Sequence, residues 1–393
     1  MLVQSAKEQK ISAWLATQHE AMIELLKDLV NIDSGSYDKP GVDAVGARLI
    51  EFYDSHNIPT TIIESTEFGN GIRACVGVDD GHCAAALMMG HRDTVFPKGE
   101  ASARPFKIEG RRAYGPGVAD MKCGLVMNAF VLAAFNKFGS TQSGPLVALI
   151  TGDEEIGSPF SKSIIEDEAR KAKFVINSEP GRGMGRLVTR RKGGVFMAME
   201  VFGVAAHSGG APQDGRSAIG ELAHKITALH ALTDFDRGIT VNVGLISGGQ
   251  SVNTTAPHAQ AKIDLRYTTP DERKEAMAAI ESIVAHSTIE DTSATLSIQG
   301  EFHPLLSTPE QTELFNLYGE AAQNYGINDI EGIFTGGCAD SGFSAGVGTP
   351  TICGAGPVGA LVHTPEEYME IDTLVPRAQI AALTVSRLDN KAS

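Results

Sequence analysis

Three short apolar segments of the sequence are each followed at once by acidic or imidazole side chains. The first covers residues 84–90 and precedes His91 and Asp93, while the other two precede Glu154 and Glu179. Because the carboxyl ends of parallel strands meet at one edge of an open α/β sheet, where ligands bind, we expect these side chains to converge. Together the three segment ends supply one histidine and five carboxylates, namely His91, Asp93, Asp153, Glu154, Glu155 and Glu179.

A further acidic residue, Asp120, follows Gly115-Pro116-Gly117 at the start of an expected helix. Taken singly, Asp120 is more typical of a helix N-cap, and Asp153-Glu154-Glu155 is more typical of a solvated turn. Taken together they favour a cation site, because converging carboxylates raise one another's pKa unless positive charge compensates them. Two divalent ions would offset four of these negative charges.

The chemical types of these side chains indicate which metal they would bind. Carboxylate oxygens with neutral imidazole and no thiolate suit Zn²⁺, for which Co²⁺ or Mn²⁺ can substitute. Two such ions at roughly 3.5–4 Å, sharing one carboxylate, polarise a carbonyl and lower the pKa of a bridging water to near 7. A second imidazole would balance the ligands, and His363, after the last expected strand, can supply it. The sequence therefore predicts a pair of divalent ions, Zn²⁺, Co²⁺ or Mn²⁺, in a hydrolytic site.

Seven short motifs, five of which contain these residues, follow one another along nearly the whole chain. They are His91-x-Asp93, Gly115-x-Gly117-x-x-Asp120-Met121-Lys122, Asp153-Glu154-Glu155-x-Gly157, Ser178-Glu179-Pro180, Ala206-His207-Ser208-Gly209, Gly336-Gly337-x-x-Asp340 and Val362-His363-Thr364-Pro365. In this order and spacing they resemble the dinuclear zinc amidohydrolases and metallopeptidases. That family includes glutamate carboxypeptidase, aminoacylase, acetylornithine deacetylase and succinyl-diaminopimelate desuccinylase, and the resemblance is closest to glutamate carboxypeptidase.

The resemblance implies a role for each of the converging side chains. Glu154 would be the general base, taking a proton from the bridging water and passing it to the departing amine. Asp93 would accept the other ring N–H of His91 and so fix its tautomer. The resemblance also implies two zinc ions per subunit, with Asp120 as the bridging ligand, His91 and Glu179 at one ion, and Glu155 and His363 at the other.

The resemblance also assigns three residues of a later segment to the substrate. His207 would reach across a dimer and donate to the developing oxyanion, an interaction worth roughly 3–4 kcal/mol for comparable donors. Asn253 and Arg266 would hold the free carboxylate of the substrate, for which the planar fork of Arg is suited. Without the flanking motifs, His207 would be interpreted as a hydrogen-bonded surface histidine and Arg266 as one partner of a surface salt bridge.

Two positions depart from the family pattern. Relatives usually have Gly after Asp-Met-Lys, where this chain has Cys123, and Gly, Ser or Thr before the Asp of the Gly-Gly loop, where it has Cys338-Ala339. We interpret Cys123 as a change in helix packing. Cys338 adjoins the substrate side, so it bears on specificity rather than on the metal. Without a neighbouring His-plus-acid pattern, a buried small hydrophobe is a better interpretation of Cys338 than a nucleophile.

The elements around the motifs predict the fold class. Apolar runs typical of buried parallel strands alternate with helix-length segments such as 119–135 and 159–172. Between residues 188 and 300 the pattern changes to strands and two helices of a compact α+β unit. We therefore predict an α/β catalytic domain, 1–187 with 301–393, whose mixed, mostly parallel sheet has helices on both faces. The inserted residues 188–300 would form an α+β lid and dimerisation domain.

Composition limits the partners. The chain has 393 residues and 42% hydrophobic content, enough for two or three domains with real cores. Its 33 Lys and Arg against 48 Asp and Glu give a formal net charge of −15, which disfavours nucleic acids and membrane surfaces. The five cysteines form no CxxC pair, which argues against a disulfide framework. With the dimer that His207 implies, we expect a cytoplasmic homodimer that acts on a small N-acyl amino acid or short peptide.

Three functions remain open. The first is hydrolysis of the amide bond ahead of a free-carboxylate amino acid, with C-terminal glutamate expected. The second is removal of an acyl group from an N-acyl amino acid, as in acetylornithine deacetylase, desuccinylase or aminoacylase. The third, of another class, is a non-catalytic metal- or ligand-binding protein on the same fold, which the presence of Glu154 and all five ligands disfavours. A peptidase that binds a free N-terminus would need an acidic pocket, whereas the candidate specificity residues are Arg and Asn.

Overall fold

The computed structural model describes residues 4–79 and 83–391, which divide into two compact units. Unit 1 takes in the chain up to residue 190, residues 305–335 and the chain from residue 340 on. Unit 2 takes in residues 191–304 together with the short segment 336–339. The predicted domain boundaries lie within a few residues of these limits, but the assignment of 336–339 to unit 2 was not expected.

Unit 1 is built around a six-stranded mixed sheet in the order β1-β2-β6-β3-β7-β14. The strands β6, β3, β7 and β14 run parallel, and the pairs β1–β2 and β2–β6 are antiparallel. Every residue of β3 (Ala86–His91) and β6 (Leu146–Thr151) is buried, as expected for central strands that are covered on both faces. The other strands are β1 (Thr60–Ile63), β2 (Gly71–Val76), β7 (Val175–Asn177) and β14 (Thr351–Ile352).

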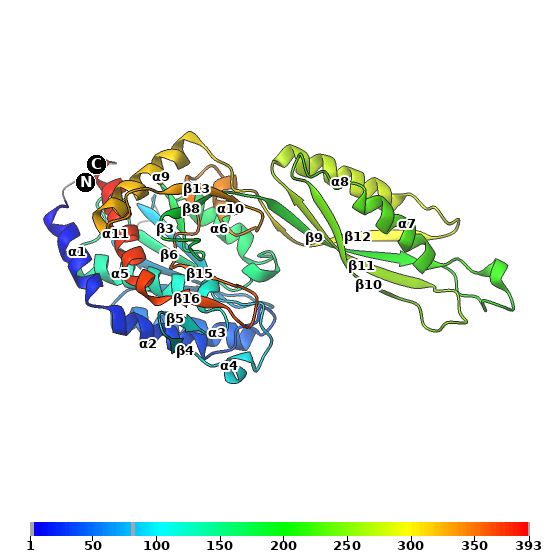
Figure 1. The fold of residues 1–393 in the computed structure, drawn as a ribbon, viewed down its shortest axis with the longest axis horizontal. Coiled ribbons are helices and arrows are strands. Elements are labelled where there is room, and N and C mark those ends of the chain that lie inside the picture. The colour runs from blue at the N-terminus through cyan, green and yellow to red at the C-terminus, as the bar shows by residue number, and fades with distance from the viewer. Residues whose placement is uncertain (1–3, 80–82, 392–393) are drawn as a thin grey trace. The chain divides into compact units, whose positions relative to one another are not determined.

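Helices cover both faces of this sheet (Figure 1). The helix α5 (Cys123–Phe138) packs on β2, β3 and β6 and is covered in turn by α1, α2 and α11. By length and composition the segment Val118–Phe138 could cross a membrane, but 94% of its apolar window is buried, the position of a core helix. The short helix α10 (Ser341–Gly346) packs against β7 and β14. The remaining helices are α1 (Ala6–Ala16), α2 (His19–Val30), α3 (Lys39–Ser55), α4 (Glu100–Ala103), α6 (Ser161–Arg170), α9 (Pro309–Ala322) and α11 (Leu374–Lys391).

A second, four-stranded antiparallel sheet in unit 1 joins two distant parts of the sequence, in the order β15-β16-β5-β4. Here β5 (Arg112–Tyr114) pairs with β16 (Tyr368–Glu370). The turn after β5 requires glycine at position 117, where φ is +72° and a Cβ atom would lie 2.5 Å from Thr94 Cγ2. The other short strands are β4 (Lys107–Glu109), β15 (Gly359–Ala360), β8 (Arg186–Arg191) and β13 (Glu331–Thr335).

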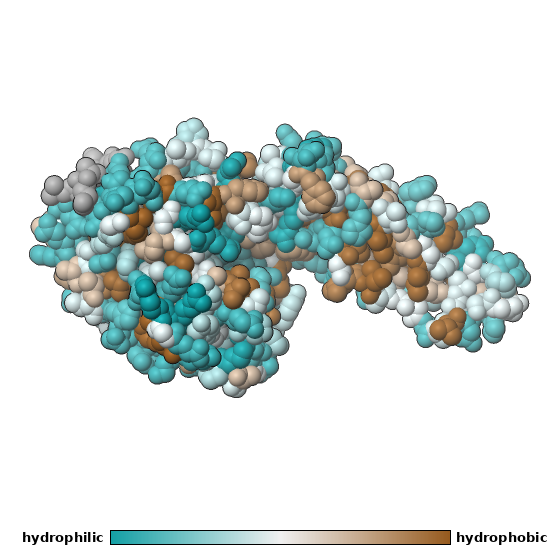
Figure 2. Space-filling model, in the orientation of Figure 1, coloured by the Kyte–Doolittle hydropathy of each residue, from teal (hydrophilic) through white to brown (hydrophobic). Residues whose placement is uncertain are grey.

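Unit 2 has a four-stranded antiparallel sheet in the order β10-β11-β9-β12, with the helices α7 and α8 packed on one face. Buried and exposed residues alternate along β11 (His258–Tyr267), as expected when one face is covered. The edge strand β10 (Thr240–Gly248) exposes Leu245 and Ile246, and Figure 2 shows apolar side chains gathered on this part of the surface. The other elements are β9 (Gly193–Phe202), β12 (Ser293–Phe302), α7 (Ala218–His230) and α8 (Pro270–Ala285). The predicted fold class is confirmed, with an inserted α+β unit interrupting an α/β unit.

Candidate metal centre and active site

The acidic and imidazole residues of unit 1 meet at the carboxyl edge of the central sheet. His91 is the last residue of β3, and Glu154 and Glu155 lie in a short 3-10 turn (Glu154–Ile156) just after β6. Glu179 follows β7, and Asp120 lies in the turn between β5 and α5. The peptide bond between Asp120 and Met121 is cis. The site is therefore assembled from the ends of three central strands and from one loop.

Two groups of side chains have the geometry of metal ligands, and they share Asp120. In the first, His91 Nε2 lies 3.1 Å from Asp120 Oδ1 and 3.6 Å from Glu179 Oε1. In the second, His363 Nε2 lies 3.4 Å from Asp120 Oδ2 and 3.2 Å from Glu155 Oε2. The ligand atoms of each group all lie within 4.8 Å of one another. Two imidazoles and two carboxylates around one shared carboxylate fit a pair of divalent cations.

The electrostatics of the cluster also indicate a need for positive charge. Burial and the negative charge of Asp120 raise the pKa of Glu155 to about 7. Hydrogen bonds to Asp120 and Glu155 raise the pKa of His363 to about 10. The pKa of His91 is raised as well. Burial lowers it, but the negative charge of Glu154 and the hydrogen bond to Asp120 outweigh the effect of burial. The raised pKa values show that the negative charge of this cluster favours binding of protons. A divalent cation would compensate the same negative charge.

Glu154 lies beside both groups without belonging to either. Its carboxylate is 6% exposed, and Oε2 lies 3.9 Å from His91 Nε2. Burial and the nearby charges of Glu179, Asp340 and Glu155 raise its pKa well above the usual range, although His91 opposes this shift. A buried carboxylate with a raised pKa, next to but outside a ligand set, is suited to accept and return a proton.

Asp93 contacts both His91, at the end of β3, and the turn of Glu154 and Glu155 that follows β6. Its carboxylate accepts the backbone N–H groups of Glu154 and Glu155, each at 3.1 Å. His91 Nδ1 lies 3.0 Å from the backbone oxygen of Asp93 and 3.4 Å from its carboxylate. The orientation of His91 therefore depends on both the backbone and the side chain of Asp93. Ser36, which sequence analysis did not single out, donates to Asp93 at 2.7 Å. No local pattern marks this serine, because it lies 57 residues from its partner.

A hollow of about 550 Å³ adjoins the centre at Glu155. Its walls are residues 35–38, residues 94–98 and Ile156, and most of this lining is aromatic or aliphatic. A hydrogen bond of 2.8 Å from Thr94 N–H to the Ser34 carbonyl joins the two wall segments. Among the described lining residues, the one basic side chain, Lys98, lies 3.4 Å from Asp38. The hollow is therefore suited to an uncharged part of a ligand.

In unit 2, His207 and Asn253 lie on adjoining exposed loops. A backbone hydrogen bond of 3.0 Å joins Ser208 N–H to the Asn253 carbonyl. His207 Nδ1 accepts the N–H groups of Gly209 and Gly210, at 3.2 and 3.0 Å. This arrangement assigns the ring proton to Nε2, which becomes the donor of an exposed imidazole.

Arg266 is held on several sides within unit 2. Its Nε lies 2.8 Å from Asp264 Oδ1, and its guanidinium stacks 5.1 Å from the centre of the Phe196 ring. Its Nη1 lies 2.6 Å from Cys338 Sγ, so Cys338 contacts a charged side chain rather than filling an apolar core. Cys123, by contrast, is fully buried at the start of α5, where Sγ donates to the Ala119 carbonyl at 3.4 Å.

The structure does not bring Asn253 and Arg266 of one chain together. Asn253 precedes β11, whose first residue is His258, and Arg266 lies near the other end of this strand. The eight residue-to-residue steps of extended strand from His258 to Arg266 span about 26 Å. One small carboxylate therefore cannot contact both side chains of the same subunit.

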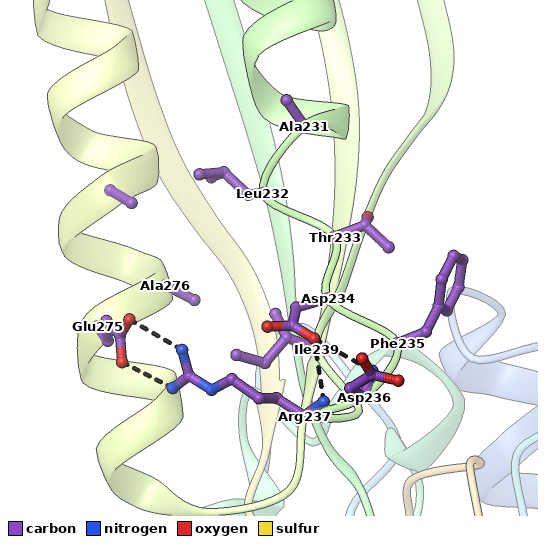
Figure 3. A pocket seen from close by; sticks show the side chains of 11 residues that line it. Ala231, Leu232, Thr233, Asp234, Phe235, Asp236, Arg237, Ile239, Glu275 and Ala276 are labelled. Atoms are coloured by element: carbon purple, nitrogen blue, oxygen red, sulfur yellow. Dashed lines mark hydrogen bonds and ion pairs between the residues drawn. The ribbon is translucent and has the colours of Figure 1, made fainter.

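Figure 3 shows another hollow, of about 480 Å³, between residues 231–239 and α8 in unit 2. Three of the charged side chains that line it are engaged with one another or with the backbone. Arg237 binds both oxygens of Glu275, at 3.0 and 2.7 Å, and Asp234 accepts two N–H groups of its own loop at 3.1 Å. None of the described residues that line it belongs to either ligand group, so we assign this hollow no part in the chemistry.

Comparison with known proteins gives consistent matches along the chain. Residues 87–387 match the model of peptidase family M20/M25/M40. Carboxypeptidase G2 of a Pseudomonas species is 28% identical over 380 residues, which cover 94% of this chain and 90% of the relative. Acetylornithine deacetylase of Vibrio campbellii is 30% identical over 269 residues, 63% of this chain and 68% of the relative. The crystal structure of an M20 family metallo-carboxypeptidase from Sulfolobus solfataricus has the same fold, with a TM-score of 0.77 at 18% identity, over 94% of this chain and 99% of that one.

Proposed function

Since this chain belongs to peptidase family M20/M25/M40, as its seven motifs predicted, we propose that it is a dinuclear zinc hydrolase of amide bonds. The bond that it cleaves would precede a free-carboxylate amino acid, with glutamate preferred. The observation that supports this most strongly is the pair of ligand groups that share Asp120 beside the buried carboxylate of Glu154. Five donors and one separate base are the parts that metal-assisted amide hydrolysis requires.

In the proposed reaction, zinc ions bound by these ligands would polarise the substrate carbonyl and acidify a water. Glu154 takes the proton of the attacking water and returns it to the amine that leaves. Its burial keeps the carboxylate basic enough for this exchange. Asp93 holds the backbone of the Glu154 turn and the ring of His91, so both keep their orientation during the proton transfers.

Two features support a free carboxylate on one side of the scissile bond and a neutral acyl group on the other. Arg266 offers a guanidinium that is already oriented by Asp264 and Phe196, and a guanidinium binds a carboxylate through two parallel hydrogen bonds. The hollow beside Glu155 has an apolar lining and is large enough for more than an acetyl group. The preference for glutamate rests on the resemblance of the motifs to those of glutamate carboxypeptidase, and the similarity to carboxypeptidase G2 along 94% of the chain supports a carboxypeptidase.

We also propose a cytoplasmic homodimer. Because His207 and Asn253 lie at the end of β11 opposite Arg266, they would serve the catalytic centre of the partner subunit. The exposed apolar edge of β10, with Leu245 67% and Ile246 64% exposed, is a suitable surface for pairing two copies. None of the five cysteines, all of which the structure describes, forms a disulfide bond, which fits a reducing compartment.

The second candidate function is removal of a small acyl group, which the similarity to acetylornithine deacetylase favours. A zinc-supplemented assay with N-benzoyl-, N-acetyl- and N-succinyl-amino acids separates the two. The proposed function predicts that acyl-glutamates have the highest kcat/KM, whereas a deacylase would favour acetyl or succinyl groups on another amino acid. A protein that binds zinc and hydrolyses none of these would favour the non-catalytic alternative.

The role of Glu154 has a direct test. We expect Glu154→Gln to lower kcat by about 10³-fold while the protein still binds two zinc ions, because the amide cannot accept a proton. Glu155→Gln should instead reduce the zinc content. Metal analysis of dialysed protein, together with the hydrolysis assay, checks both variants. Full turnover in Glu154→Gln would contradict the proposed mechanism and leave metal binding unaffected.

A further inference from the structure

One buried carboxylate near the metal centre has no part in the chemistry described so far. Glu367 is completely buried, and its Oε1 accepts the backbone N–H groups of Ala119 at 2.8 Å and Asp120 at 3.0 Å. Its Oε2 accepts the N–H of Gly117 at 3.2 Å. A carboxylate that binds three backbone donors of one loop fixes the conformation of the loop that supplies them. This loop presents Asp120, which both ligand groups share.

The small antiparallel sheet brings Glu367 to this loop from the far end of the sequence. The register of β5 and β16 places Tyr114 opposite Tyr368. Glu367 immediately precedes Tyr368, and the loop from Gly115 to Asp120 immediately follows Tyr114. The carboxylate therefore lies where the loop begins, at the N-terminal side of the 16-residue helix α5, where a negative charge is favoured.

Glu367 also belongs to the segment that presents His363. The His363 ring is half exposed, so packing contributes little to its position, and its backbone has a φ of +64°. The conformation of residues 361–367 must therefore place the ring. A hydrogen bond from Glu367 N–H to the Thr364 carbonyl, at 3.2 Å, and one from Arg104 to the Pro365 carbonyl, at 2.7 Å, hold this segment.

We propose that Glu367 is a positioning residue that fixes the Asp120 loop and the His363 segment relative to each other, so that both ligands reach one metal ion. This proposal rests on the proposed function, in which Asp120, Glu155 and His363 bind zinc. The hydrogen bonds of the Glu367 carboxylate go to the backbone of the Asp120 loop, so Glu367 acts through the backbone. Its neighbour Glu366 is exposed, and its backbone N–H donates to the Thr364 hydroxyl, which makes it a matched control.

The test compares zinc binding by Glu367→Gln, Glu367→Ala and Glu366→Gln in the full-length protein. Binding of each ion is measured by titration of metal-free protein in zinc-buffered solution and, separately, by the absorption spectrum of the Co²⁺ form. We expect the Kd for one of the two ions to rise about tenfold in Glu367→Gln and up to about 100-fold in Glu367→Ala. In Glu366→Gln both Kd values should equal those of the unmodified protein.

A purely structural role would lower the melting temperature of the metal-free protein and leave the zinc affinities and the Co²⁺ spectrum unchanged. That result would overturn the proposal, as would Glu367→Gln failing to fold by circular dichroism. If the unmodified protein binds two ions but hydrolyses no acyl amino acid, the proposed function fails while the affinity comparison still decides the role of Glu367. If the unmodified protein binds no zinc, both proposals fail.

Discussion

Arg266 is oriented before any substrate binds, because Asp264, Phe196 and Cys338 hold its guanidinium. We expect Arg266→Lys to raise KM for an acyl-glutamate by about tenfold or more and to lower kcat less. The reason is that a lysine ammonium cannot form the two parallel hydrogen bonds of a guanidinium. Steady-state kinetics checks the prediction. Arg237→Lys is the matched control, since Arg237 lies in the same unit but pairs with Glu275. An unchanged KM in Arg266→Lys would exclude it from carboxylate binding.

The sequence indicates the metal-binding residues because each follows an apolar run or a glycine turn within a recognisable motif. The structure places the five predicted ligands within two groups, and it places Glu154 beside them. Ser36 and Glu367 could not be predicted in the same way, because their partners are far along the chain. Adjacent in the sequence, Glu366 and Glu367 look alike, and only the pairing of β16 with β5 decides which of the two is buried.

At the scale of elements, the turn before α5 determines where Asp120 lies. Gly117 has a φ of +72° and no room for a Cβ atom, since Thr94 Cγ2 would be 2.5 Å away. We expect Gly117→Ala to lower the free energy of unfolding of the metal-free protein by about 3 kcal/mol, from backbone strain and steric overlap. Gly99→Ala is the control, because Gly99 also has a positive φ but nothing within 4 Å of a Cβ. Urea titration measures the free energy of unfolding of both variants. Equal losses of stability would show that backbone strain, and not the steric overlap with Thr94, accounts for the effect.

The helix α7 of unit 2 depends on a buried ion pair. Glu221 lies 3.0 Å from Lys225, and its Oε2 accepts the N–H groups of Thr288 at 3.0 Å and Ile289 at 2.7 Å. Burial raises the pKa of Glu221, but these hydrogen bonds outweigh it and lower the pKa below its usual value. The pair therefore stabilises unit 2 fully above the unfolded pKa, about 4.3, and this stabilisation is lost as the pH falls through the lower folded pKa.

We accordingly expect Glu221→Gln to destabilise unit 2 by about 3 kcal/mol at pH 7, because Lys225 loses its partner. The difference between the two proteins should shrink as the pH falls from 5 to 3, where the carboxylate of Glu221 becomes protonated. Hydrogen exchange of the β9 and β11 amides, followed by mass spectrometry, measures the stability of unit 2 by itself. Glu281→Gln, at an exposed position of α8, is the control. If the difference in the stability of unit 2 between the unmodified protein and Glu221→Gln did not change with pH, the charge of Glu221 would not be its cause.

The central elements could be predicted and the smallest ones could not. Uninterrupted apolar runs identified β3 and β6, and the predicted helices at 119–135 and 159–172 overlap α5 and α6. The sheet of β15, β16, β5 and β4 was missed, because its strands have two or three residues and show no periodicity. This sheet nevertheless brings the His363 segment to the Asp120 loop.

At the scale of the whole molecule, the length of β11 has a consequence that sequence spacing does not reveal. Asn253 and Arg266 are 13 positions apart, a separation that a hairpin could close, but the strand between them is extended. His207 lies with Asn253, since Ser208 N–H donates to the Asn253 carbonyl. If Arg266 and His207 have the proposed roles, unit 2 would bind substrate through both ends of β11 and would serve two catalytic centres of a symmetric dimer.

Heterodimers with two different affinity tags test this arrangement. If His207 acts in the centre of the partner, a dimer of one His207→Ala subunit and one Glu154→Gln subunit retains one complete centre. We expect it to have about half of the unmodified activity, although each parent homodimer is nearly inactive. The matched heterodimer pairs an unmodified subunit with a subunit that carries both His207→Ala and Glu154→Gln. It should be nearly inactive, because the one centre that keeps Glu154 depends on the position 207 that is substituted in the partner. If His207 acted within its own subunit, the two results would be exchanged, since the same two substitutions would then spoil both centres in the first dimer and only one in the second.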